Sequence, residues 1–195
     1  MKPLQRATSE LRTKRLVLRR LRTSDAEPMF ALFNNWQVVR WLSSPPWPYT
    51  IDHAHAFVRE RMKTRQNPAE TILVICVGDA LIGAIDWMPP SDPAFVRTPM
   101  LGYWLGQPYW GRGYMTEAAR VFIAHAFASG AGENIRSGAF ADNAASLRVQ
   151  EKLGFVCDGE TLLASRPRGA KFPHVNTVLT RSRFESALRE PEGCP

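Results

Sequence analysis

A strand-helix-strand unit in the second half of the chain limits the folds that the chain can adopt. Residues 100–105 and 134–140 are β-rich runs, and residues 114–128 between them carry apolar side chains at helical spacing. Turn-linked pairs of β-rich runs stand on both sides of this unit and predict hairpins. The pattern therefore predicts an α/β fold with a mixed sheet and helices on both faces, and not the all-parallel sheet of a Rossmann fold.

The remaining elements bring the sheet to about seven strands in one domain. The further strands are expected at 15–19, 71–77, 81–87, 155–165 and 175–180, and the further helices at 26–33, from a cap at Thr50 or Asp52 to Lys63, and at 143–153. A length of 195 residues suits a single domain. We place this domain at 10–186, between loose ends at 1–9 and 187–195.

Composition favours a reduced, cytoplasmic protein. Hydrophobic residues make up 45% of the chain, yet no apolar run approaches the ~20 residues of a membrane helix. The first residues lack the apolar stretch of a signal peptide. Three scattered cysteines, Cys76, Cys157 and Cys194, indicate neither a disulfide framework nor a metal site. We therefore expect no membrane contact and no metal, and either a monomer or a homodimer.

The chain is basic, with a formal net charge of +7. Such a charge attracts polyanions, whether nucleic acid or phosphorylated cofactors, although it also fits plain solubility. Because no base-reading motif is present, nucleic acid is not expected as a partner.

A glycine-spaced turn joins the strand at 100–105 to the helix at 114–128. Gly111 and Gly113 stand on either side of Arg112, directly before the first N–H groups of the helix. Those N–H groups have no intrahelical partner and carry partial positive charge, so they can cradle a pyrophosphate. An ordinary tight turn before a helix is the alternative. A Walker loop would need Gly-Lys-Ser/Thr, and a dinucleotide fingerprint would need a third glycine where Thr116 stands.

The same stretch carries a resemblance to a known family. Residues 110–114 and 116–118, Trp-Gly-Arg-Gly-Tyr and Thr-Glu-Ala, resemble the acyl-CoA loop of the GNAT N-acetyltransferases, most closely the branch of the ribosomal-protein alanine N-acetyltransferases. Four further stretches agree with that branch in order and spacing, and the resemblance runs from about residue 11 to 182. These stretches are 13–19, 23–26, 101–105 and 143–155.

The resemblance implies the GNAT fold, in which the fourth and fifth strands splay apart and acetyl-CoA lies in the splay. A backbone N–H of the fourth strand would polarise the acetyl carbonyl. Met115 departs from the family, which has Gly or Ala there, and either crowds the phosphate or turns into the core. The implied cofactor-binding residues are Trp104, Leu105, Trp110, Gly111, Arg112, Gly113, Tyr114, Met115, Thr116 and Asn143.

Polar residues on the helix at 143–153 form a second constellation. Asn143, Ser146 and Gln150 share one helical face, which without the resemblance would be a solvated face. The core face is expected to carry Ala145, Val149 and Leu153. The resemblance implies that Asn143 binds the pantetheine arm and that Ser146 lies near the sulfur as the catalytic hydroxyl. Many GNAT enzymes have a tyrosine in the slot of Gln150, which is no acid.

The amine acceptor must be neutral when it attacks. An α-amino group has a pKa of about 7.7–8.0, against about 10.4 for lysine, so an α-amine needs little help from a base. The candidate bases are Asp86 and His174, and each of them fits a structural role equally well. The expected acceptor contacts are Trp41, Trp47 and Tyr103. The basic loop 165–171 either guides an acidic acceptor or is solvated.

These features together predict direct transfer of an acetyl group from acetyl-CoA to an amine in a ternary complex. A peptide or protein N-terminus is favoured as acceptor over an amino acid, polyamine or drug. A non-catalytic CoA-binding module on the same fold is the alternative from a different class. A covalent serine hydrolase is not expected, because no Gly-x-Ser-x-Gly turn occurs.

Overall fold

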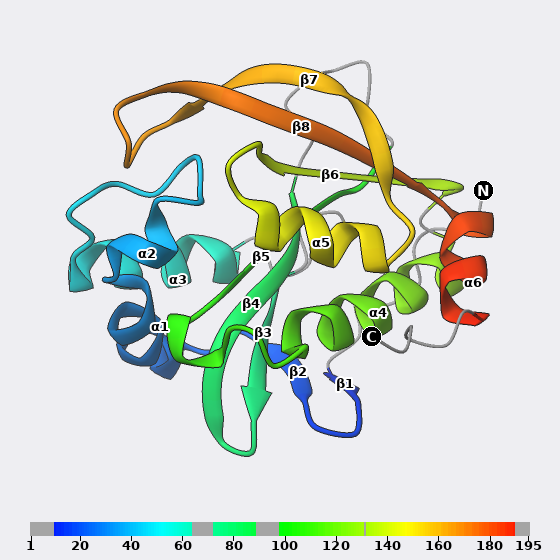
Figure 1. The fold of residues 1–195 in the computed structure, drawn as a ribbon. Coiled ribbons are helices and arrows are strands. Elements are labelled where there is room, and N and C mark those ends of the chain that lie inside the picture. Colours follow the sequence, from blue (N-terminus) through cyan, green and yellow to red (C-terminus); the bar gives the residue numbers. More distant parts are fainter. Residues whose placement is uncertain (1–9, 64–71, 89–97, 131, 190–195) are drawn as a thin grey trace.

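One sheet runs through the computed structural model, which describes residues 10–63, 72–88, 98–130 and 132–189. The strand order is β1-β2-β3-β4-β5-β6-β8-β7 (Figure 1), and only the β5–β6 pair is parallel. The strands are β1 (Glu10–Arg12), β2 (Val17–Arg20), β3 (Ile72–Val77), β4 (Ala80–Met88), β5 (Met100–Leu105), β6 (Asn134–Phe140), β7 (Val156–Ser165) and β8 (Ala170–Thr180).

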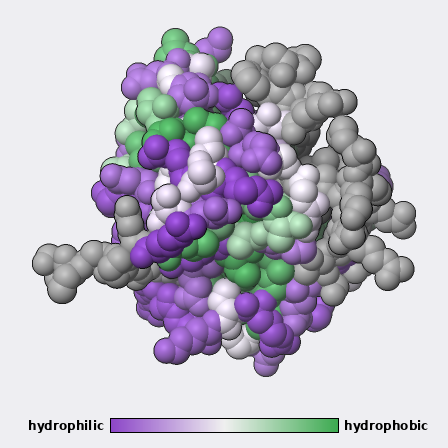
Figure 2. Space-filling view, turned by 90° about the vertical axis from the view of Figure 1, so that its right-hand side faces the viewer, coloured by the Kyte–Doolittle hydropathy of each residue, from purple (hydrophilic) through white to green (hydrophobic). Residues whose placement is uncertain are grey.

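Helices cover both faces of this sheet and divide its core into two clusters. The α1, α2 and α3 helices enclose one cluster, and α4, α5 and α6 lie on the side of the other. Figure 2 shows the side on which α6 lies, where hydrophilic residues predominate and apolar residues gather between them. The helices are α1 (Ala26–Phe33), α2 (Trp36–Val39), α3 (Ile51–Lys63), α4 (Tyr114–Ala128), α5 (Ala144–Lys152) and α6 (Arg181–Arg189).

The mixed sheet with helices on both faces confirms the expected α/β fold class. The structure also contains elements that the sequence did not predict. The sheet has eight strands because β1 pairs with β2, so the expected fourth and fifth strands are β5 and β6. The short α2 and the terminal α6 were not expected, and α6 extends past residue 186 to Arg189. It follows β8 without a loop, where the Thr180 hydroxyl accepts from the N–H of Arg183 at 3.2 Å. The expected loose end at 1–9 lies outside the described residues.

The parallel pair β5–β6 separates soon after it begins. Its register holds one pair, Met100 with Arg136, and the Arg136 N–H donates to the Pro99 carbonyl at 2.9 Å. The Ser137 hydroxyl then donates to the Leu101 carbonyl at 3.0 Å. Past this point the strands diverge, and α5 lies against the divergence (Figure 1). We call this region the splay.

A buried ion pair fixes the start of α1 against β2. The Arg19 guanidinium donates to both carboxylate oxygens of Asp25 at 2.8 Å, and the Arg22 N–H donates to the same carboxylate at 2.7 Å. The Asp25 side chain is 4% exposed, so this carboxylate depends on these donors. Removing one partner of a buried pair leaves the other charge uncompensated.

We predict that Asp25→Ala lowers the free energy of unfolding by about 3 kcal/mol, because the largely buried Arg19 would lose its carboxylate partner and the Arg22 N–H its acceptor. Urea denaturation followed by circular dichroism measures this loss. Glu185→Ala, on the exposed side of α6, is the control and should change stability by less than about 0.5 kcal/mol. Equal stability of the two variants would contradict the importance of the pair.

Candidate active site

The glycine turn has the backbone geometry that its sequence predicts. Gly111 and Gly113 both have a φ of 73°, a region that favours glycine. The first helical hydrogen bond of α4 runs from the Glu117 N–H to the Gly113 carbonyl at 3.0 Å. The three preceding helical N–H groups therefore have no intrahelical acceptor. With the partial positive charge of the helix start, they suit a phosphate oxygen.

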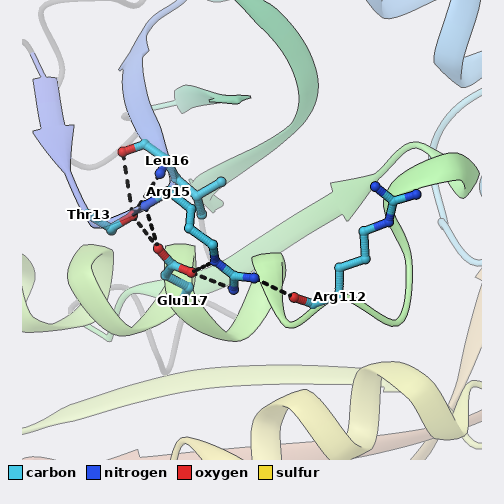
Figure 3. Close-up of polar contacts among 5 residues, drawn as sticks. All are labelled: Thr13, Arg15, Leu16, Arg112 and Glu117. Carbon is cyan, nitrogen blue, oxygen red and sulfur yellow. Dashed lines mark hydrogen bonds and ion pairs between the residues drawn. The ribbon is translucent and has the colours of Figure 1, made fainter. Parts of the chain in front are cut away.

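A clamp from the β1–β2 turn holds this loop (Figure 3). The Arg15 Nε donates to Glu117 Oε2 at 2.6 Å, and its Nη1 donates to the Arg112 carbonyl at 3.0 Å. The Thr13 hydroxyl donates to Glu117 Oε1 at 2.5 Å. Burial alone raises the pKa of Glu117, but the hydrogen bonds from Thr13 and Arg15 outweigh it and leave that pKa lowered. The carboxylate stays ionised and links the loop to the sheet.

The side chains of the loop have separate roles in packing. Met115 lies in the first turn of α4 and is buried in the core cluster that this helix covers. Its side chain therefore turns inward and does not crowd the glycine turn. The Tyr114 ring lies under the Arg15 guanidinium at 4.7 Å. The Trp110 indole is 40% exposed and donates its Nε1–H to the Leu105 carbonyl at 2.8 Å. The Arg112 side chain points away from the clamp in Figure 3.

Alternate peptide groups of β5 face opposite neighbours. The N–H of Gly106 bonds to β4, whereas the carbonyl of Leu101 bonds to β6. Because this direction alternates along a strand, the N–H groups of Tyr103 and Leu105 face the splay. The peptide of Trp104 faces β4, and its ring packs on the α1 side of the sheet.

Four polar side chains meet beside the splay, and we call them the Ser146 cluster. They are Tyr103, Ser146, Gln150 and Thr177. The Tyr103 and Ser146 hydroxyl oxygens lie 2.8 Å apart. The Gln150 Nε2 lies 3.3 Å from each of them, and the Thr177 hydroxyl donates to Gln150 Oε1 at 2.6 Å. Tyr103 thus contacts Ser146 on the α5 side of the sheet.

The α5 helix differs in part from its expected faces. Gln150 is 1% exposed and belongs to the interior, and Ala145, expected in the core, is exposed. Leu153 is buried as expected. Asn143 is the N-cap, where its Oδ1 accepts from the Ser146 N–H at 3.2 Å. The spacing of Ser146 and Gln150 was a usable signal, whereas nothing in the sequence placed Thr177 beside them.

The two candidate bases lie on the opposite face of the sheet. Asp86 pairs with Arg61 of α3 at 2.8 Å, and burial raises the pKa of Asp86 although Arg61 opposes that shift. The His174 ring covers Gly138 of β6 and contacts Asn176 at 3.1 Å. Burial lowers the pKa of His174, although the Asn176 hydrogen bond opposes this, so the imidazole is neutral at pH 7.

The segments expected to meet the acceptor lie together. The Arg166 N–H donates to the Ser43 carbonyl at 2.8 Å, which joins the β7–β8 turn to the loop after α2. Trp47 is 39% exposed, and Trp41 lies under the guanidinium of Arg40 at 4.5 Å.

The basic turn between β7 and β8 was expected either to guide an acidic acceptor or to be solvated. Its Arg168 is not solvated. The Arg168 side chain is 7% exposed and pairs with Asp142 at 2.9 Å. Its guanidinium lies 3.7 Å from the centre of the Phe172 ring and 4.2 Å from that of Phe140. It therefore packs the turn against β6.

Among the described residues, no group of three or more His, Cys, Asp or Glu side chains could hold a metal ion. In the same ranges, no helix has the length and apolar character to cross a membrane.

Comparisons with known proteins agree with this geometry. Residues 15–156 match the model of the acetyltransferase (GNAT) domain. The probable N-acetyltransferase YjcK of Bacillus subtilis is 28% identical over 158 residues, which cover 76% of this chain and 84% of YjcK.

Solved structures share the fold at lower identity. The microcin C7 self-immunity acetyltransferase MccE, solved with acetyl-CoA and AMP, aligns with a TM-score of 0.75 and 22% identity over 86% of this chain and 93% of MccE. The ribosomal-protein-S5-alanine acetyltransferase of Vibrio fischeri has a TM-score of 0.75 and 20% identity over 90% of this chain and 98% of that one. Because the matched domain covers most of the chain and confirms the resemblance in its motifs, the protein belongs to the GNAT acetyltransferase family.

Proposed function

We propose that this protein transfers an acetyl group from acetyl-CoA to an amine by direct attack in a ternary complex. The glycine turn carries this proposal, because its unpaired N–H groups and two left-handed glycines form a phosphate cradle that the Arg15 clamp holds in place. In the proposal, the pyrophosphate lies on residues 111–116, and the pantetheine arm pairs with the peptides of Tyr103 and Leu105. The side-chain amide of Asn143 adds a hydrogen bond to that arm.

The acetyl carbonyl lies in the splay, where a β5 N–H polarises it as negative charge develops on its oxygen. The amine nitrogen attacks the carbonyl carbon and forms the new C–N bond. When the tetrahedral intermediate collapses, the C–S bond breaks and its electron pair stays on sulfur. The proton lost by nitrogen balances the proton gained by the thiolate. The Ser146 hydroxyl donates a hydrogen bond to that sulfur.

The two faces of the sheet separate the group proposed to stabilise the thiolate from the candidate bases. The Ser146 cluster lies on the α5 face, whereas Asp86 and His174 lie on the face covered by α1 and α3. An amine that enters from the second face has a base available, while the thiolate leaves toward the first. His174 is neutral at pH 7 and is the better base of the two, because Asp86 is already paired with Arg61.

We favour a peptide or protein α-amine as acceptor. One structural neighbour is named as an acetyltransferase of ribosomal protein S5 alanine, and an α-amine is partly neutral near pH 7.5. Thiol release from acetyl-CoA, measured with a panel of N-terminal peptides and small amines, tests this choice. Turnover with small amines alone would identify the other acceptor class. Coenzyme binding in calorimetry without turnover on any acceptor would favour a non-catalytic CoA-binding module.

We predict that Gly113→Glu weakens acetyl-CoA binding at least about tenfold, because a carboxylate would occupy the proposed phosphate position and the positive φ disfavours a side chain. Isothermal titration calorimetry measures the dissociation constant. Gly130→Glu is the matched control, since Gly130 has a φ of 82° at the other end of the same helix. An affinity for Gly113→Glu equal to that of this control would remove the phosphate cradle from the proposal.

We predict that Ser146→Ala lowers kcat by about 10²-fold, the lower end of the range for positioned proton donors, and leaves the Kd for acetyl-CoA within about twofold. Steady-state kinetics and calorimetry give the two values. Ser182→Ala, which changes an exposed hydroxyl on α6, should retain wild-type kcat. A wild-type kcat for Ser146→Ala would end the role of this hydroxyl.

A further inference from the structure

The amide of Gln150 has a fixed orientation inside the Ser146 cluster. The Gly138 carbonyl can only accept, so the end of the amide that faces it is the donor Nε2, and the other end, Oε1, accepts from the Thr177 hydroxyl across 2.6 Å. One Nε2 proton lies toward the Gly138 carbonyl at 3.2 Å. The second lies toward the hydroxyls of Tyr103 and Ser146, each at 3.3 Å. Both amide protons are therefore directed away from Thr177.

The remaining hydroxyl protons follow from this orientation. Burial raises the pKa of Tyr103 more than its hydrogen bonds with Ser146 and Gln150 lower it, so the phenol keeps its proton. That proton has two acceptors within reach, the Ser146 carbonyl at 3.2 Å and Ser146 Oγ at 2.8 Å. When Tyr103 and Gln150 both donate to Ser146 Oγ, this oxygen accepts inside the cluster. Its own proton is then free to point into the splay.

We propose that Thr177 and Gln150 are positioning residues that turn the Ser146 hydroxyl into a donor directed at the leaving thiolate. The inference rests on the proposed function, since it requires a thiolate in the splay. Thr177 touches no reacting atom and acts with the Gly138 carbonyl, since the two together hold the Gln150 amide with Nε2 toward Ser146. If the amide turned over, Oε1 would face Ser146 and accept its proton, and the thiolate would lose its hydrogen bond.

The step keeps atoms and electrons in balance. The C–S bond breaks with both electrons on sulfur, and the Ser146 hydroxyl donates a hydrogen bond to the thiolate while keeping its proton, because a thiol is a much stronger acid than an aliphatic alcohol. Donors to Ser146 Oγ polarise its O–H bond and strengthen that hydrogen bond. The attacking nitrogen releases one proton to the base or to water, and the departed thiolate takes up one proton from water, so protons and charge balance.

The test is a double-mutant cycle between Thr177 and Ser146. We expect Thr177→Val to lower kcat by about tenfold with the Kd for acetyl-CoA unchanged within about twofold, because the buried Oε1 of Gln150 loses its donor and the amide is held less firmly. Thr177→Ser keeps the hydroxyl and should restore kcat. In the Ser146→Ala background, Thr177→Val should lower kcat no further. Thr161→Val, an exposed position on β7, is the matched control.

The outcomes separate this inference from the proposed function. A wild-type kcat for Ser146→Ala would sink the role of the serine itself. A slow Ser146→Ala enzyme with wild-type kcat for Thr177→Val would sink only the positioning role. Equal further loss in the Ser146→Ala background would show that Thr177 supports the fold alone. If Thr177→Val fails to fold, Gln150→Met takes its place in the double-mutant cycle, because it removes the amide itself.

Discussion

The divergence of β5 from β6 is the constraint on which the rest of the site depends. On the β6 side, the Gly138 carbonyl faces the splay and receives the Gln150 amide, which replaces the missing strand partner. On the β5 side, the N–H groups of Tyr103 and Leu105 have no strand opposite them within the described part of the chain. Buried main-chain groups need partners. The asymmetry supports pairing of an extended amide-bearing arm with β5 and not with β6.

The glycine turn, proposed as the phosphate cradle, depends on contacts that come from far away in the chain. Glu117 lies in the first turn of α4, where its negative charge is favourable to the helix but would repel a bound phosphate. The ion pair with Arg15 at 2.6 Å neutralises that charge, and Arg15 also holds the Arg112 carbonyl. The clamp therefore fixes the loop while removing the one acidic charge beside it in the first turn.

The sequence predicted those elements whose signals are local. The limits of β5, α4 and β6 follow from apolar spacing and from the glycine turn, and each matches the structure. The Arg15 clamp and Thr177 were not predicted, because both depend on which strands lie side by side. Helical spacing correctly placed Gln150 on the face of Ser146 but could not show its burial, since a long polar side chain can be buried where partners satisfy both ends of its amide.

The position of β8 between β6 and β7 connects the two faces of the site. Successive side chains of a strand point to opposite faces, so Thr177 reaches the Ser146 cluster while His174 covers Gly138 on the other side. The β8 strand thus carries both Thr177, which is proposed to position the Ser146 cluster, and His174, the better candidate base. A shift of β8 by one residue would exchange the faces of both side chains. The long antiparallel register with β6, from Asn134 opposite Thr180 to Phe140 opposite His174, is what keeps each group on its own side.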